Sequence, residues 1–178
     1  HCAPEFHLPE LFTGQDRGFD PRSSNGKPTL LMFWSSTCKH CQKEIPQLLK
    51  HVQEHPGEFN VVSVALIHSD EPAGFSHRKV TEAYVKTNGL PWLVLDDSSG
   101  FAQDLYRVTT TPTTFLITPS GEIAGAWYHP HENLDSAIEP VLARLSQSGS
   151  ACTPLPAETT KRASFSMENP EGGTVSIE

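Results

Sequence analysis

The sequence has no long hydrophobic run and comparatively little positive charge. No stretch of 18 consecutive apolar residues occurs among its 178 residues, so no segment is predicted to cross a bilayer. It has 13 Lys and Arg residues against 21 Asp and Glu residues, for a formal net charge of −8. A negative field of this kind repels nucleic acids and anionic membrane surfaces. We therefore expect neither of them as a partner.

The sequence also lacks a signal peptide, an initiating methionine and internal repeats. It opens on His1 and Cys2, which is typical of a processed or trimmed chain. This start leaves open an upstream signal or membrane anchor, through which the protein would be tethered.

Cysteine is scarce, and the four cysteines fall into an inner pair, Cys38 and Cys41, and an outer pair, Cys2 and Cys152. A bridge between the outer two would close a loop of roughly 150 residues and stabilise the fold by about 4 to 5 kcal/mol in the chain-entropy model. Such a bridge would indicate an oxidising compartment. The alternatives are a free Cys2 in a frayed terminus, or a Cys2 that once carried a lipid, although His1 does not fit a lipoprotein cleavage site.

The inner pair lies between an apolar run, residues 30–34, and a segment whose apolar residues recur at helical spacing. This pattern predicts a buried strand followed by a helix, with the cysteines at the junction. Unpaired N–H groups and the positive end of the helix dipole stabilise a thiolate at Cys38. Cys41 lies about one turn further on the same face, within reach of a disulfide. We therefore predict that Cys38 attacks and Cys41 resolves, with their redox-active disulfide in place of a cofactor.

Three neighbours of the cysteines are expected to modulate this chemistry. Lys39 and His40 add positive charge beside Cys38, and stabilising the reduced thiolate raises the reduction potential, so His40 favours an oxidant. Trp34 is expected to lie half in the core and half at the rim of the site.

Strand and helix patterns alternate through the rest of the chain. We expect strands at 29–34, 60–67, 92–95, 112–117 and 123–127, helices at 39–55, 78–87, 101–106 and 132–146, and a short hairpin within residues 1–28 that covers one end of the sheet. This order predicts an α/β fold, a three-layer sandwich around a mixed central sheet. Residues 1–149 would form this domain together with its N-terminal extension.

The composition changes after Gly149. Residues 151–162 are rich in Pro and Thr, and apolar residues alternate before and after the turn sequence at 169–173. The β-prone tail, residues 150–178, is therefore expected to form a hairpin, to add one strand to a sheet edge, or to begin a further domain.

Several motifs together resemble a known family over roughly residues 6–146. They are Gly26-Lys27-Pro28, Phe33-Trp34-Ser35-Ser36, Cys38-x-x-Cys41, Glu44-Ile45-Pro46, residues 108–117 and Ser120-Gly121-Glu122-Ile123. In these motifs the chain resembles thioredoxin-fold thiol-disulfide oxidoreductases of the TlpA/ResA type, which are membrane-tethered and extracytoplasmic. It departs from the common pattern at Thr37, Lys39-His40, Thr110 and Met32.

The resemblance assigns roles to further residues. Glu44, one turn after Cys41, would exchange protons with it; otherwise Glu44 is an ordinary acidic residue near a helix start. Pro112 would be cis after Thr111, which brings the Thr111 backbone opposite the sulfurs, where an extended client segment can pair with it as an added strand. Without the resemblance, Pro112 would be read as a trans proline that opens an edge strand.

The resemblance implies a periplasmic or otherwise extracytoplasmic enzyme that reduces disulfides of client proteins and is recharged by a membrane electron donor. The resemblance also implies a role in cytochrome c biogenesis, on cysteines destined for haem attachment. The alternatives are an oxidant of client thiols, a copper-handling module that binds the metal through Cys38 and Cys41, and an interaction domain without turnover.

Histidine is plentiful, with nine residues. His51 and His55 are four apart on the first predicted helix, and His129 and His131 precede the last one. Pairs of this kind can hold a metal, but we read them as solvated neighbours and expect no metal site.

Overall fold

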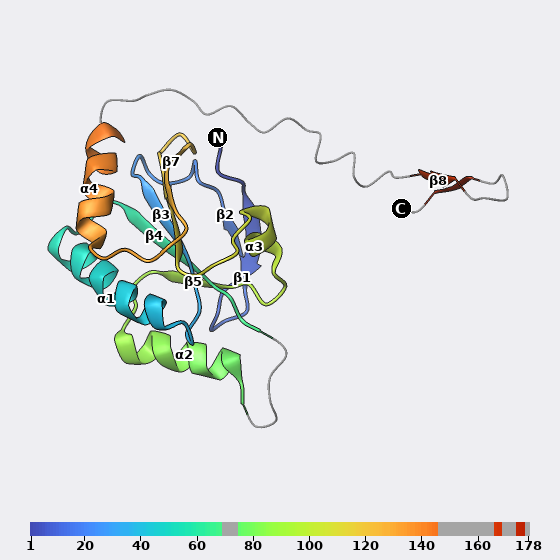
Figure 1. Cartoon of the computed structure of the whole chain (residues 1–178), viewed down its shortest axis with the longest axis horizontal. Coiled ribbons are helices and arrows are strands. Elements are labelled where there is room, and N and C mark those ends of the chain that lie inside the picture. Colours follow the sequence, from blue (N-terminus) through green and yellow to red (C-terminus); the bar gives the residue numbers. More distant parts are fainter. Residues whose placement is uncertain (69–74, 146–165, 169–173, 177–178) are drawn as a thin grey trace.

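A computed structural model describes residues 1–68, 75–145, 166–168 and 174–176 (Figure 1). The strands are β1 (Phe6–Pro9), β2 (Asp16–Phe19), β3 (Thr29–Trp34), β4 (Asn60–Ala65), β5 (Leu93–Asp96), β6 (Thr113–Ile117), β7 (Ile123–Trp127), β8 (Ser166–Glu168) and β9 (Thr174–Ser176). The helices are α1 (Lys39–Glu54), α2 (His77–Asn88), α3 (Phe101–Leu105) and α4 (Leu134–Leu145). The predicted order of elements is confirmed, with ends shifted by one or two residues.

Five strands form a mixed sheet in the order β5-β4-β3-β6-β7. β3 pairs in parallel with β4 and antiparallel with β6, so that Met32 lies between Ser63 and Thr114. Every residue of β3 is buried, as expected of a central strand covered on both faces. The loop that carries the cysteines therefore begins at a strand that is covered on both faces.

Alternate residues of β3 belong to two cores, one on each face of the sheet, because successive strand side chains point to opposite faces. Leu30, Met32 and Trp34 pack with α1, α2 and α4, whereas Leu31 and Phe33 pack with the β1–β2 hairpin and α3. Figure 1 shows the helices α1, α2 and α4 on one side of the sheet and the hairpin with α3 on the other. The predicted three-layer sandwich is confirmed.

The N-terminal hairpin differs from the prediction in its position. It packs Phe6, Leu8 and Phe19 onto a face of the sheet, and Leu11 N–H donates a hydrogen bond to the carbonyl of Val94. The expectation that it covers one end of the sheet was therefore wrong. Three large apolar side chains require a face, because a strand end offers mainly backbone groups.

In the tail, β8 and β9 pair antiparallel as a separate two-stranded sheet. The two predicted strand segments of the tail thus pair with each other and not with the five-stranded sheet, and the remaining residues of 150–178 lie outside the described residues. The predicted domain boundary at residue 149 and Cys152 lie outside the described residues.

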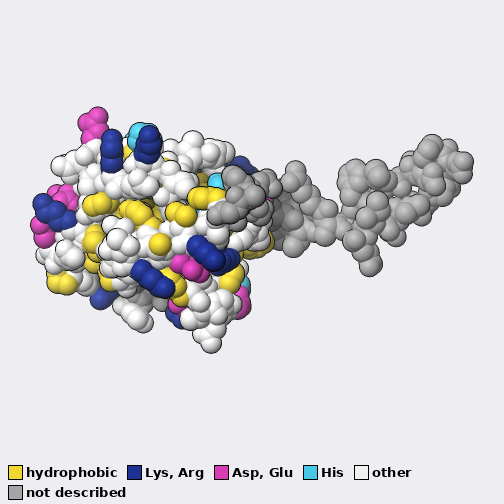
Figure 2. Space-filling view, turned by 90° about the horizontal axis from the view of Figure 1, so that it is seen from below, with side chains coloured by type: hydrophobic (Ala, Val, Ile, Leu, Met, Phe, Trp, Pro, Cys, Tyr) yellow, Lys and Arg dark blue, Asp and Glu magenta, His cyan; other side chains and the backbone are white. Residues whose placement is uncertain are grey.

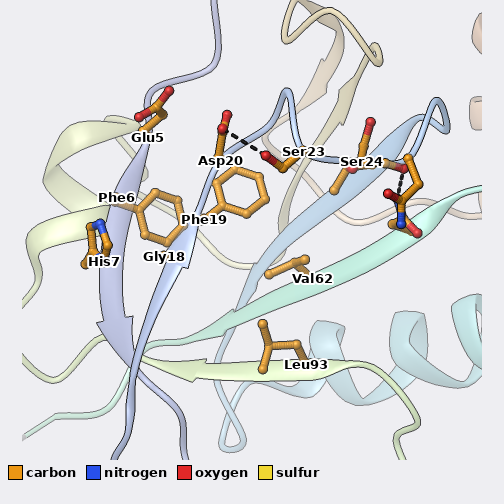
Figure 3. A pocket seen from close by; sticks show the side chains of 13 residues that line it. Glu5, Phe6, His7, Gly18, Phe19, Asp20, Ser23, Ser24, Val62 and Leu93 are labelled. Atoms are coloured by element: carbon orange, nitrogen blue, oxygen red, sulfur yellow. Dashed lines mark hydrogen bonds between the residues drawn. The ribbon is translucent and has the colours of Figure 1, made fainter.

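One cleft of the described part lies away from the cysteines. A cleft of about 670 Å³ lies between the hairpin and the starts of β3, β4 and β5 (Figure 3), whereas Cys38 follows the far end of β3. On the face in Figure 2, basic, acidic and apolar side chains are interspersed. None of the helices described here is both long and apolar enough to cross a membrane.

Candidate active site

Cys38 is the residue that caps the start of α1. It has extended backbone angles, φ −81° and ψ 115°, and its Sγ accepts a hydrogen bond from the backbone N–H of Cys41 at 3.2 Å. The side chain is partly exposed. An N–H group directed at the sulfur stabilises negative charge there, so Cys38 combines access with stabilisation of its thiolate.

Cys41 has the opposite environment. Its side chain is buried in the core beneath α1. Burial, followed by the hydrogen bond to Cys38, raises the pKa of the Cys41 thiol to about 12. The protein therefore presents one accessible sulfur and one sulfur that stays a thiol until a base takes its proton.

The loop before the cysteines is fastened to α2. The His68 N–H donates to His77 Nδ1 at 2.9 Å, so His77 Nε2 carries the proton and donates to the Ser35 hydroxyl at 3.3 Å. Ser36 and Thr81 share a hydrogen bond of 2.9 Å between their hydroxyls. Sequence reasoning missed this support, because His77 lies 42 residues from Ser35 and no local pattern joins them.

Glu44 is buried and pairs with His131. Its Oε1 accepts hydrogen bonds from the His131 backbone N–H, at 3.0 Å, and from the His131 ring. Its Oε2 is buried and has no hydrogen-bond partner among the described residues. The expectation of a solvated His131 was wrong, because this side chain is only 3% exposed. Glu44 and Cys41 lie one turn apart, on the buried face of α1.

The loop that carries Thr111 lies against Cys38. The peptide bond between Thr111 and Pro112 is cis, and the Cys38 thiol donates to the Thr111 carbonyl at 3.5 Å. The hydroxyl of Thr110 donates to the carbonyl of Tyr128 at 2.8 Å, and that of Thr113 to the carbonyl of Thr110 at 2.7 Å. These bonds fix the loop beside the accessible sulfur.

Other predicted site residues are placed as follows. Lys39 and His40 are exposed on the first turn of α1. Trp34 was expected to lie half in the core and half at the rim, but it is fully buried and packs near Tyr84, with ring centroids 5.4 Å apart. This correction follows from its place in β3, where both faces of the strand are covered.

Cys2, of the outer pair, is buried, and its backbone forms an isolated antiparallel β-bridge with that of Glu122. Its predicted disulfide partner Cys152 is not among the described residues.

The sheet order, the two cysteines at the start of a helix and the cis-proline loop beside them define a thioredoxin-like thiol-disulfide oxidoreductase. The sequence profile described as "AhpC/TSA family" matches residues 1–126. The chain belongs to this family.

Individual relatives agree with this assignment. The chain is 32% identical over 123 residues to "Sporulation thiol-disulfide oxidoreductase A" of Bacillus subtilis, covering 68% of this chain and 70% of the relative. It is 28% identical over 124 residues to "Thiol-disulfide oxidoreductase ResA" of Oceanobacillus iheyensis, covering 68% and 60% of the two chains. The match thus spans somewhat under two thirds of the second relative.

A solved structure shares the fold. It is that of the exposed lipoprotein thioredoxin Etrx1 of Streptococcus pneumoniae, with 25% identity, a TM-score of 0.57, and 80% of this chain and 100% of that chain covered. The resemblance to oxidoreductases of the TlpA/ResA type is confirmed at the level of fold and enzyme class.

Proposed function

We propose that the protein reduces disulfides of client proteins outside the cytoplasm, with Cys38 as the nucleophile and Cys41 as the resolving thiol. The observation that carries this proposal is the contrast between the two sulfurs. Cys38 is partly exposed and accepts a backbone N–H, whereas Cys41 is buried with its pKa raised to about 12.

The exchange takes place in two steps. The Cys38 thiolate attacks one sulfur of the client disulfide, forming a mixed disulfide and releasing the other client sulfur as a thiolate. Cys41 then loses its proton and attacks Cys38 Sγ, which releases the second client sulfur. The client gains two electrons and the protein is left with the Cys38–Cys41 disulfide, which a dithiol donor reduces again.

Glu44 is the proposed acceptor of the Cys41 proton. Burial disfavours the Cys41 thiolate, so the second step needs a base close to this sulfur. Glu44 is buried one turn away, and its Oε2 has no hydrogen-bond partner among the residues described. His131 holds the other oxygen, which leaves Oε2 for proton transfer.

Client segments are proposed to bind along the loop that carries Thr111 and Pro112. The Thr111 carbonyl lies 3.5 Å from the Cys38 sulfur, so an extended segment that hydrogen-bonds to this backbone would bring its own disulfide to Cys38.

The proposed direction is reduction. An oxidant would require strong stabilisation of the reduced thiolate, but Lys39 and His40 are exposed, and solvent and salt screen their charges. The buried Glu44 side chain supplies no positive charge to the pair.

The proposed location and partners follow the relatives. Etrx1 is described as an exposed lipoprotein, which supports an extracytoplasmic site and a membrane tether for the present protein. A membrane electron donor and clients with haem-binding cysteines remain proposals from the TlpA/ResA resemblance.

The reduction potential of the Cys38–Cys41 couple tests the direction. We expect a value near that of thioredoxin, about −270 mV, from equilibration with glutathione buffers. A value near about −120 mV, that of a strong oxidant, would contradict reduction.

Trapping tests the order of attack. The Cys41→Ala protein should retain client proteins as mixed disulfides on Cys38, released by dithiothreitol and identified by mass spectrometry. The matched control is the protein that lacks both thiols, Cys38→Ala with Cys41→Ala. Equal retention by the two proteins would refute the proposed exchange.

A further inference from the structure

A second group of chemically active side chains lies at the other end of α1. His51, His55 and Glu58 each offer a ligand atom, and these atoms lie within 4.8 Å of one another. At about 1.5 Å per residue, the 14 residues from Cys41 to His55 span roughly 21 Å of helix. The group is therefore separate from the cysteine site.

The expectation that His51 and His55 are solvated neighbours was wrong for His51. Its side chain is only 1% exposed and stacks on Phe59, with ring centroids 5.3 Å apart and an interplanar angle of 22°. The His55 side chain is 44% exposed, and its ring lies 4.6 Å from that of His51. The pair thus joins one fixed imidazole to one that solvent can reach.

Both ring nitrogens of His51 face a carboxylate. Nδ1 lies 2.5 Å from Asp135 Oδ1, at the start of α4, and Nε2 lies 3.3 Å from Glu58 Oε1. A neutral imidazole has one N–H only. When this proton points to Asp135, a lone pair of Nε2 points at the Glu58 carboxylate. A cation between these two acceptors removes the repulsion, and that cation is either a second proton or a metal ion.

The spacing of the ligand atoms suits a metal ion. Ligands about 2.0 to 2.2 Å from a tetrahedral zinc ion lie about 3.3 to 3.6 Å from one another. Two pairs of ligand atoms have such separations, 3.3 Å for His51 Nε2 to Glu58 Oε1 and 3.5 Å for His55 Nδ1 to Glu58 Oε2. A backbone turn, in which the Glu58 N–H donates to the His55 carbonyl at 3.3 Å, holds two of the ligands together.

Asp135 supplies the support that histidine ligands of metals usually have. A carboxylate that accepts the second ring N–H fixes the tautomer and makes the free nitrogen more basic. Here this carboxylate comes from α4, 84 residues further along the chain. Binding at Nε2 would thereby couple the end of α1 to the start of α4.

We propose that His51, His55 and Glu58 bind a divalent transition-metal ion of the zinc type, with Asp135 orienting His51 and water completing the coordination. Two imidazoles and one carboxylate suit Zn²⁺ and its neighbours, whereas Mg²⁺ and Ca²⁺ prefer oxygen ligands alone. Because the ion binds the folded chain, it stabilises the protein by mass action.

The test is calorimetric titration of the full chain with Zn²⁺ in a large excess of Mg²⁺. All proteins carry Cys38→Ser and Cys41→Ser, so that these two thiols do not compete for the metal. We expect one Zn²⁺ per chain and a rise in the midpoint of thermal unfolding. Affinity should fall at least tenfold in His55→Ala and in Glu58→Gln, and about 10- to 100-fold in Asp135→Asn.

His7→Ala is the matched control. His7 is also paired with a carboxylate, Asp16 at 3.1 Å, but it is exposed and lies in the β1–β2 hairpin. This variant should bind Zn²⁺ like the parent protein. The proposal fails if the parent protein binds no Zn²⁺ at millimolar concentration, or if His55→Ala or Glu58→Gln binds it as tightly as the parent. His51 itself is left intact, because its burial makes a folding defect expected.

Discussion

Two cysteines three residues apart differ sharply in their surroundings. Cys38 stands before the first turn of α1 and receives the Cys41 N–H, while the Cys41 side chain turns into the core. The spacing alone predicts that the sulfurs can meet. The difference in burial decides which of them attacks.

The first prediction concerns the ionisation of Cys41. In a Cys38→Ser protein, the rate of alkylation of Cys41 by iodoacetamide should rise with pH well beyond 9.0, because burial, the largest cause of the raised pKa, remains. A stopped-flow pH series measures this rate. A plateau at the pH at which a free cysteine ionises would show that Cys41 is not buried as described.

The same pKa shift has a consequence for stability. The pKa of Cys41 is higher in the folded chain, at about 12, than its ordinary value of 9.0. The reduced protein is therefore fully stable with respect to this group below pH 9.0, and it loses stability as pH rises from there toward 12.

The second prediction tests Glu44. Glu44→Gln keeps an oxygen that can accept the His131 hydrogen bonds but removes the proton acceptor. We expect the release of client thiol from a preformed mixed disulfide to slow by about 100-fold, measured in single-turnover experiments. The control is Glu54→Gln, which changes an exposed carboxylate of the same helix, paired with Lys50 at 3.8 Å, and should leave the rate unchanged. Equal rates in the two variants would remove Glu44 from the mechanism.

The partner of Glu44 marks the limit of sequence reasoning at this scale. Glu44 was a candidate because it follows Cys41 by one helical turn and matches a family motif. His131 lies 87 residues away, and nothing in its local sequence distinguishes it from His129, which is exposed. Contacts across such separations depend on how α1 meets the loop before α4.

At the scale of elements, the helices and strands follow closely from local patterns, but their docking does not. The helix predicted at 101–106 is found as α3, and the hairpin within residues 1–28 is found as β1 and β2. A tertiary contact joins α3 to the N-terminal segment that precedes β1. Tyr106, which ends α3, donates a hydrogen bond of 2.6 Å from its hydroxyl to the carbonyl of Pro4.

The third prediction tests this connection. Tyr106→Phe should lower the free energy of unfolding by about 1 kcal/mol, because the Pro4 carbonyl loses its donor while the ring still packs on Phe6 and Phe33. Burial raises the pKa of Tyr106, so the hydroxyl remains a donor in neutral solution. Urea denaturation measures the change.

Tyr128→Phe is the control for this substitution. Tyr128 is 52% exposed, and the loss of its hydroxyl should leave the unfolding free energy nearly unchanged. If both variants were equally stable, the bond from α3 to the N-terminal segment would contribute nothing measurable.

At the scale of the whole molecule, the proposed active site lies within residues 34–131. It combines the start of α1, the loop before β6 and the loop before α4. The N-terminal hairpin covers the opposite face of the sheet. The tail contributes no residue to the site among those described.

The fourth prediction concerns that tail. A chain that ends at residue 149 should reduce a model disulfide such as insulin at the rate of the full chain, because every proposed site residue is retained. An insulin turbidity assay compares the two. A collapse of activity in a truncated protein that still folds, by circular dichroism, would contradict the proposed division at residue 149.

The same deletion removes Cys152, so the thermal stability of the truncated chain is measured separately from its activity. If Cys2 and Cys152 are bridged, both the truncated chain and full-length Cys152→Ala should unfold at lower temperature than the parent, by a similar amount. Loss of stability in the truncated chain alone would assign the effect to the rest of the tail.

The sequence by itself determined the elements, the three-layer α/β class and the position of the reactive cysteines. These features depend on hydrophobic periodicity and on the chemistry of a helix start, and both are local in the chain. The resemblance to a known family added Glu44, Thr111 and Pro112 as candidates.

Only the tertiary structure decided which side chains are buried and what they meet. The burial of Trp34, the pairing of Glu44 with His131, the support of Ser35 by His77, and the group around His51 all join segments far apart in the sequence. Such contacts form where helices and loops from different parts of the chain pack together on one sheet. Periodicity within a single segment carries no information about them.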